Sequence, residues 1–234
     1  MHDAEIAARA LENWFEKHGR KFPWRFSNDP YRILVVELLL QRTRAEMVNR
    51  LYSSFFEKYP TLESLASAKI EDLNRFFSKL GLMYRGIRIK KIAEEILKKY
   101  GGAIPCNMDS LLRLHGVGIY IASAVLNFGC DCPVPVIDKN VLRMLSRFRG
   151  MARESSMREF ISELYKYGDH KKLAYALIDI GSLICGRKML CDKCPLDKFC
   201  PKLSIAEESW RVLRKVIDKQ GRIKLQEQPI GKAK

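Results

Sequence analysis

The sequence lacks any long, uninterrupted apolar run. A membrane span needs about 18 such residues, and the longest apolar stretch, Ile33–Leu40, is broken by Glu37. The chain begins Met-His-Asp-Ala-Glu, without the basic and apolar regions of a secretory signal. It also shows no internal repeat and no low-complexity block. We therefore expect a folded cytoplasmic protein without a membrane span.

Acidic residues are scarce relative to basic ones. The 234 residues include 42 Lys and Arg against 27 Asp and Glu, a formal net charge of +15 at pH 7, and 47% are hydrophobic. That hydrophobic share is too high for a disordered basic tail. A folded chain with this charge favours a polyanionic partner, and nucleic acid comes first. Composition alone leaves a membrane surface or a ribosomal partner open.

Strand-forming runs are few and short. The β-branched segment Val134–Ile137 is flanked by prolines and is too isolated to build a sheet. Helical periodicity dominates instead, with an opening helix that ends at Gly19 and a buried one that starts at Pro30. The sequence predicts an all-α protein. Further helices are expected over 61–67, 70–79, 86–100, 108–114, 119–129, 138–148, 156–167 and 171–185.

Four of the seven cysteines fall close together near the C-terminus, as Cys185-x5-Cys191-x2-Cys194-x5-Cys200. This density indicates metal ligation in a reducing cytosol rather than a disulfide framework. Four thiolates suit a tetrahedral zinc ion or a [4Fe–4S] cluster. Only one CxxC pair is present, between two single cysteines on longer arms, and this layout favours the larger cluster over zinc.

The other three cysteines show no spacing that suggests a partner. Cys106 precedes a predicted helix, and Cys130 and Cys132 follow another. We interpret all three as buried or incidental thiols.

A glycine-rich turn, Leu114–Gly118, separates two predicted helices. The glycines at 116 and 118 permit a tight hairpin whose backbone N–H groups face outward, which suits one phosphate of a DNA strand. In a protein of this charge, the turn favours sequence-independent DNA binding. A helix–helix turn without a ligand is the alternative. The expected contacts are His115, Gly116, Val117 and Gly118.

Two carboxylates stand out from their surroundings. Asp138 follows an apolar extended segment and opens a helix, so it is either an N-cap or a functional acid. Tyr120 lies on the first turn after the hairpin, and we expect the hairpin, Tyr120 and Asp138 to face one cleft. Glu37 lies in an apolar helix, where an unpaired carboxylate costs several kcal/mol. A structural salt bridge and a functional acid are equally good interpretations of Glu37.

Three motifs in this order resemble one family. The hairpin, the segment Val136–Arg147 and the four-cysteine loop are similar to the helix-hairpin-helix DNA glycosylases of the endonuclease III superfamily, over residues 22–201. The resemblance implies two helical domains flanking a cleft: a barrel over 28–135, and a second domain over 1–27 plus 136–234 that holds a [4Fe–4S] cluster. It also implies a monomer in the nucleoid that binds double-stranded DNA with one mismatched base flipped out.

The resemblance assigns roles to the site residues. Asp138 matches the catalytic aspartate, which stabilises an oxocarbenium-like sugar or activates water. Glu37 matches the residue that contacts or protonates the flipped base. Tyr120 replaces the lysine of bifunctional members, so no imine forms and the enzyme is monofunctional. Lys139 lies beside Asp138, but on a helix it should point elsewhere.

The same resemblance predicts contacts with the duplex. Gln41 matches the residue that fills the gap left by the flipped base, and Leu82 lies in a shortened wedge loop. Two departures are present: the first cysteine interval is x5 where x6 is usual, and the hairpin reads LHGVG where LPGVG is usual. The remaining predicted DNA contacts are Arg42, Asn140, Arg143 and Arg147.

Tyrosine at position 120 is typical of two subgroups, which remove thymine or uracil opposite guanine, or adenine opposite guanine or 8-oxoguanine. Adenine glycosylases usually carry a second C-terminal domain of about 100 residues or more, whereas this chain continues for about thirty residues past Cys200. We therefore expect the thymine/uracil subgroup. An adenine glycosylase and a non-catalytic iron–sulfur protein that binds damaged DNA are the alternatives.

Overall fold

Helices account for most of the protein, in a computed structural model that describes residues 2–78, 83–151 and 153–200. Within these ranges no β-strand forms, and the only bridge joins Cys185 to Met189. None of the described helices has the length and apolarity that a membrane crossing requires. The all-α prediction is confirmed. The helices are α1 His2–His18, α2 Pro30–Leu40, α3 Ala45–Lys58, α4 Leu62–Ala66, α5 Ile70–Ser78, α6 Met83–Tyr100, α7 Met108–Arg113, α8 Ile119–Ala124, α9 Lys139–Arg149, α10 Glu154–Leu164 and α11 His170–Asp179.

Side-chain caps fix where several helices begin. The Asp29 carboxylate accepts from the Tyr31 N–H ahead of α2, whose first residue is Pro30. Asp138 caps α9 and Asp169 caps α11 in the same way. Helices α8 and α11 each run on into a π-helical turn, Val125–Gly129 and Ile180–Ile184 respectively. The helices predicted over 119–129 and 171–185 are therefore α-helices with π-helical ends.

Helix α3 is absent from the sequence-based expectations. It buries Val48, Tyr52, Phe55 and Phe56, a spacing that follows one helical face. No side chain caps its start at Arg44. The aromatic side chains of this face pack with one another and with α5, with the rings of Phe55 and Phe56 5.2 Å apart. The periodicity was sufficient to predict this helix.

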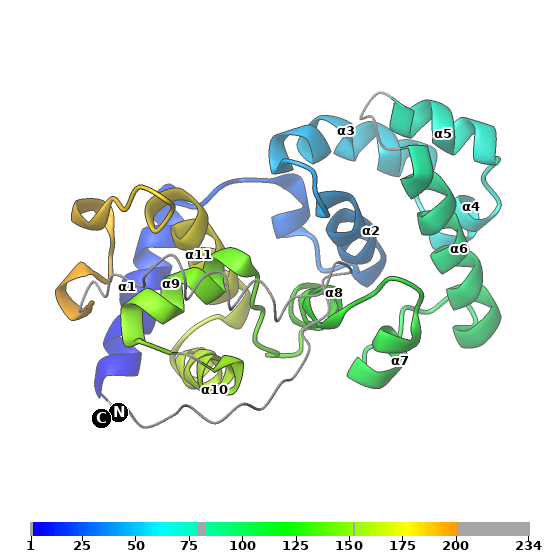
Figure 1. The fold of residues 1–234 in the computed structure, drawn as a ribbon. Helices are drawn as coiled ribbons and strands as arrows, with labels where there is room; N and C mark the ends of the chain where they lie inside the picture. The colour runs from blue at the N-terminus through cyan, green and yellow to red at the C-terminus, as the bar shows by residue number, and fades with distance from the viewer. Residues whose placement is uncertain (1, 79–82, 152, 201–234) are drawn as a thin grey trace, which may run out of the picture.

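Buried side chains form two clusters. One contains most of the core of α2 to α8, and the other is formed by α1, α9, α10, α11 and Leu196 of the cysteine loop. Figure 1 shows α2–α8 on one side of the molecule and α1 with α9–α11 on the other. The division into domains at 28–135 and 1–27 plus 136–234 stays a prediction.

The interpretation of Cys106 and Cys130 as incidental thiols is wrong. The two form a disulfide across 24 residues of sequence, whereas Cys132 keeps a half-buried thiol. The chain enclosed by the bond contains α7, the glycine hairpin, α8 and the π-helical turn that follows. Because the sulfurs meet only when this unit has folded back on itself, their spacing in the sequence gave no sign of pairing. The bond joins both ends of the helix-hairpin-helix unit.

Candidate active site

Three predicted site residues meet in one cavity of about 680 Å³. Glu37 comes from the middle of α2, Tyr120 from the first turn of α8, and Asp138 from the residue before α9. The cavity also takes wall residues from the loop before α2 and from α10 and α11. Two carboxyl groups and a phenol, from segments as far as about a hundred residues apart in sequence, thus line the same cavity.

Glu37 is the more deeply buried acid, with 4% of its surface exposed. Burial raises the pKa of Glu37 to about 7, and the charge of Asp138 adds to this effect. A hydrogen bond donated by the Tyr120 hydroxyl and the charge of Arg25 act in the opposite direction. Among the described residues the Oε2 atom of Glu37 has no hydrogen-bond partner. Glu37 therefore holds a proton near neutral pH and has one oxygen available to a ligand.

Asp138 has the opposite kind of surroundings. Its Oδ1 accepts from the backbone N–H groups of Asn140 at 2.8 Å and Val141 at 2.7 Å, and its Oδ2 accepts from the Asn140 side-chain amide at 2.8 Å. Burial raises the pKa of Asp138, but these donors and the charge of Arg143 favour the anion. Asp138 is thus both the N-cap of α9 and a residue of the site, because the hydrogen bonds that cap the helix also hold its carboxylate at the cavity wall.

Tyr120 joins the two acids. Burial, followed by the charges of Glu37 and Asp138, raises the pKa of Tyr120 well above its usual value. The phenol therefore stays protonated and acts as a hydrogen-bond donor. Lys139 also lines the cavity, so the expectation that it points elsewhere finds no support here.

An ion-pair network in the wall of the cavity was not anticipated from the sequence. The fully buried Asp179 accepts two hydrogen bonds of 2.7 Å from Arg25 and one of 2.7 Å from Arg20. Burial alone would raise the pKa of Asp179, yet the bonds and charge of Arg25 outweigh it and the pKa is lowered. The Arg25 guanidinium also lies over the Tyr175 ring, 4.5 Å from its centroid. This network joins the loop before α2 to α11.

Gln41 and Arg42 lie at the end of α2 and line the same cavity. Arg42 has a φ of 60°, a left-handed conformation that is uncommon for a residue other than glycine. The turn between α2 and α3 thereby brings Gln41, Arg42, Thr43 and Arg44 against the cavity in succession. Leu82 lies outside the described residues.

The glycine hairpin lies beside this cavity rather than in it. Ile119 and Tyr120 line the cavity, but residues 115–118 are not part of its wall. Gly116 has a φ of 78°, which favours glycine, and the side chain of Val117 is buried. Tyr120 and Asp138 therefore line one cavity together, and the expectation that the hairpin faces the same cleft stays a prediction.

Comparison with known proteins identifies the family. Residues 35–168 match the HhH-GPD superfamily of base excision DNA repair proteins. The chain belongs to this family. A thymine-DNA glycosylase of Aeropyrum pernix is 35% identical over 208 residues, which cover 84% of this chain and 93% of that protein. An adenine DNA glycosylase of Buchnera aphidicola is 30% identical over 88% of this chain and 61% of that protein.

Solved structures give the same family fold. The structure of a thermostable thymine-DNA glycosylase superposes with a TM-score of 0.79 at 29% identity, covering 85% of this chain and 95% of the other. A trapped covalent complex of endonuclease III with DNA superposes with a TM-score of 0.69 at 21% identity, over 88% of this chain and 95% of the other, which shows the fold alone. The predicted resemblance to the endonuclease III superfamily is confirmed.

In this HhH-GPD protein, the predicted DNA contacts Arg143 and Arg147 lie between α9 and the cysteine loop, whereas Asn140 lines the cavity beside Asp138. Arg143 donates from Nε to the Cys185 carbonyl at 2.9 Å and from Nη2 to Asn140 Oδ1 at 3.2 Å. Arg147 donates from Nη1 to the carbonyls of Cys185 at 3.1 Å and Gly186 at 2.8 Å. Both arginines have structural partners, and their contact with DNA stays a prediction, as does that of Asn140.

The four C-terminal cysteines converge. Cys185, Cys191, Cys194 and Cys200 line one cavity, which apolar side chains of α9 and the cysteine loop enclose. Burial raises the pKa of Cys194 to about 11, and the other three thiols add to the effect. Convergence in an apolar pocket, with Arg147 Nη1 3.5 Å from the Cys185 sulfur, suits a cluster that carries negative charge. The donor set therefore fits an iron–sulfur cluster.

Proposed function

We propose that this protein is a monofunctional DNA glycosylase that hydrolyses the N-glycosidic bond of thymine or uracil mispaired with guanine. The single observation that carries the proposal is the pair of carboxyl groups that face one cavity: Glu37, whose pKa burial raises to about 7, and Asp138, whose carboxylate accepts three hydrogen bonds. A protonated acid and a carboxylate are the two groups that hydrolysis of a glycosidic bond requires.

The two carboxyl groups have different roles in the proposed reaction. As the bond between the sugar C1′ and the base nitrogen breaks, its electron pair leaves with the base, and Glu37 supplies a proton to the departing base. The Asp138 carboxylate stabilises the positive charge that develops on the sugar. Water then attacks C1′ and gives its proton to Asp138. Tyr120 has no amine, so no imine forms with the sugar and the abasic strand stays intact.

Two unpartnered atoms support recognition of a base in this cavity. Arg25 Nε and Glu37 Oε2 are buried polar atoms for which the described residues supply no hydrogen-bond partner. A pyrimidine presents carbonyl oxygens and an N–H group along one edge, so the Arg25 donor and the Glu37 carboxyl complement it. Trp24 and Tyr175 belong to the wall of the cavity and give the space for a flipped base part of its apolar lining.

Adenine is the second candidate substrate. The adenine glycosylase relatives favour it, and adenine also combines a donor and an acceptor on one edge. The thymine-DNA glycosylase of Aeropyrum pernix and a thymine/uracil-DNA glycosylase of Pyrobaculum aerophilum have slightly higher identity, 35% and 32%, and match over 93% and 86% of their lengths. We therefore place pyrimidine removal first.

We also propose that Cys185, Cys191, Cys194 and Cys200 hold a [4Fe–4S] cluster. When bound, the group would brace the loop that Arg143 and Arg147 hold against α9. The spacing supports a larger cluster over zinc, because only one CxxC pair is present and it lies between two single cysteines on longer arms. Iron and sulfide analysis, with the absorption spectrum of the purified protein, tests this assignment.

The proposed activity is tested by single-turnover base release from duplexes with G·T, G·U or A·8-oxoguanine pairs, read with and without alkali. We expect cleavage of the G·T and G·U strands only after alkali. Release of adenine alone would move the protein to the second candidate. Binding of all three duplexes without any base release would support a non-catalytic damage-binding protein. Cleavage without alkali would implicate Lys139 as a lyase nucleophile.

A further inference from the structure

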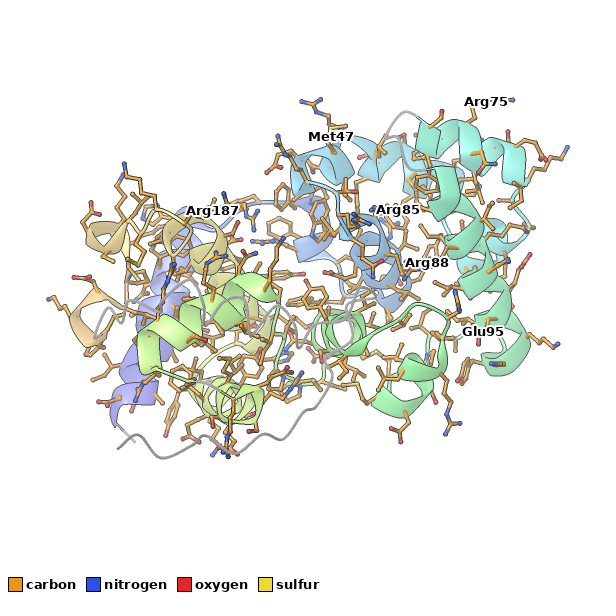
Figure 2. The ribbon with its side chains drawn as sticks, in the orientation of Figure 1. Met47, Arg75, Arg85, Arg88, Glu95 and Arg187 are labelled. Carbon is orange, nitrogen blue, oxygen red and sulfur yellow. A yellow bond between two sulfur atoms is a disulfide. The ribbon has the colours of Figure 1, made fainter. Side chains whose placement is uncertain are left out.

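An arginine of α6 contacts two elements that the function needs to act together. Arg88 Nη1 donates to Gln41 Oε1 at 2.9 Å, and Nη2 of the same guanidinium donates to the carbonyl of Gly116 in the hairpin. Figure 2 labels Arg85, Arg88 and Glu95 along α6, with the two arginines on the side toward α2. One planar side chain thus joins the end of α2 to the hairpin.

Gly116 is shaped for this contact. A Cβ at position 116 would overlap the Arg88 guanidinium, and the φ of 78° is itself unfavourable for other residues. Glycine at this position therefore allows both the left-handed turn and the close contact with Arg88. Arg88 is half-buried, and burial lowers its pKa without removing its charge at neutral pH.

A second arginine holds the residues on either side of Gln41. Arg85 Nη1 donates to the Leu39 carbonyl at 2.5 Å and to Thr43 Oγ1 at 2.7 Å. The left-handed Arg42 lies within this span. The turn that presents Gln41 to the cavity is thus fixed from behind by two neighbouring turns of α6.

The hairpin has a further tie to α6 at its other side. The backbone N–H of His115 donates to Glu95 Oε2 at 3.2 Å, and Glu95 Oε1 pairs with Lys99 at 2.6 Å. A proline at position 115 would have no N–H to donate. Arg88 and Glu95 therefore bind a carbonyl and an amide of the same turn from one helix.

We propose that Arg88 is a positioning residue that holds Gln41 in a fixed place relative to the hairpin. Gln41 is expected to enter the duplex and the hairpin to bind the DNA backbone, so Arg88 sets the geometry between the two. This inference rests on the proposed function. A guanidinium is suited to the task because its fork reaches two acceptors at once, whereas a lysine ammonium on a flexible stem cannot hold the same geometry. Losing this contact would leave DNA affinity largely intact and slow base flipping.

The test compares Arg88→Met and Arg88→Lys with Lys91→Met, which removes the same charge from an exposed position of α6. Base flipping is followed by the fluorescence of a 2-aminopurine beside the uracil of a G·U pair, at saturating enzyme. For Arg88→Met we expect flipping about tenfold slower, because a small misplacement of a positioning group has a large kinetic effect. Affinity should change by no more than about threefold, as in Lys91→Met.

Two comparisons separate positioning from general stability. Arg88→Lys should keep the charge and the thermal unfolding midpoint yet flip slowly. In a Gln41→Ala background, Arg88→Met should slow flipping by less than about twofold, because the two residues act through one contact. Normal flipping in Arg88→Lys, or the same tenfold loss with and without Gln41, would overturn the proposal. Failure of the wild type to release any base would refute the proposed function instead, since the fluorescence measurement does not depend on base release.

Discussion

The middle of α2 and the start of α9 present the same chemical group to one cavity in different hydrogen-bonding surroundings. In α2, Glu37 is surrounded by apolar residues and its Oε2 has no partner among the described residues, so burial keeps its proton. At the start of α9, Asp138 accepts three hydrogen bonds, two of them from backbone N–H groups of the first turn. The comparison teaches that burial raises the pKa of both carboxyl groups, but that only the one at a helix start receives backbone hydrogen bonds that oppose this effect.

Removing the carboxylate at the helix start should give the largest effect. Asp138→Asn keeps a good N-cap but loses the negative charge, so we expect base release to fall by roughly a thousandfold. Binding of a G·U duplex, measured by fluorescence anisotropy, should stay within about threefold of wild type.

Asp138→Ala is the matched control for the cap. It should be equally inactive and should also lower the free energy of unfolding by about 1 kcal/mol, because the cap is lost. Wild-type base release by Asp138→Asn would contradict the role of this carboxylate.

Removing the acid inside α2 should give the next largest effect. Glu37→Gln cannot donate a carboxylic proton, and we expect base release to fall about a hundredfold at pH 6. Wild-type activity should decrease as the pH rises through about 7, where Glu37 ionises, and this decrease should be absent from Glu37→Gln. A pH–rate profile of both proteins measures it, and identical profiles would contradict the assignment.

Glu37 should also affect stability in a predictable direction. Its pKa is higher in the folded than in the unfolded protein, so its contribution to stability is present below the unfolded pKa of about 4.5 and is lost as the pH rises through about 7. The loss is on the order of 3 kcal/mol at pH 8. Urea unfolding at pH 5 and pH 8 should therefore show Glu37→Gln gaining stability relative to wild type at the higher pH. A constant difference at both pH values would count against a raised pKa.

The link between the two acids should give a smaller effect. The Tyr120 hydrogen bond lowers the pKa of Glu37, so Tyr120→Phe should move the alkaline decrease in activity to higher pH. We expect a loss in rate of no more than about tenfold at pH 6, because one hydrogen bond to a charged group is removed. A shift of the profile to lower pH would show that Tyr120 does not act on Glu37.

Removing the disulfide should have the smallest effect on activity. It tests whether the pKa values of the two acids depend on the overall stability of the fold. Cys106→Ser with Cys130→Ser should lower the free energy of unfolding by about 3 kcal/mol, since the bond closes a loop of 24 residues. The alkaline decrease in the pH–rate profile should not move, because neither cysteine lines the cavity. A moved profile would mean that the electrostatics of the two acids depend on this brace.

The sequence predicted the acids of the site better than the contacts that support them. Glu37 was identifiable because it interrupts an apolar helix, and Asp138 because it precedes a helix after an extended segment. Such signals are local. The Arg25–Asp179 pair and the Cys106–Cys130 bond join residues 154 and 24 positions apart, and only the tertiary fold brings them together.

Helix α3 is a different kind of omission. Its buried aromatic face has an ordinary helical spacing, but no capping side chain marks its beginning at Arg44. The sequence also gave no reason to connect Arg88 with Gln41, since the two lie 47 residues apart and on different helices. Positioning contacts of this type depend on how helices pack, which local patterns do not encode.

A titration of the carboxyl groups tests the contrast between the two acids most directly. Carboxyl carbons labelled with ¹³C would be followed by NMR from pH 4 to pH 9 in the wild type, with Glu37→Gln and Asp138→Asn used for assignment. We predict that one glutamate titrates at about pH 7 and disappears in Glu37→Gln, while Asp138 ionises at a lower pH than Glu37. Titration of Glu37 at the pH of an ordinary exposed glutamate, or below that of Asp138, would contradict the account.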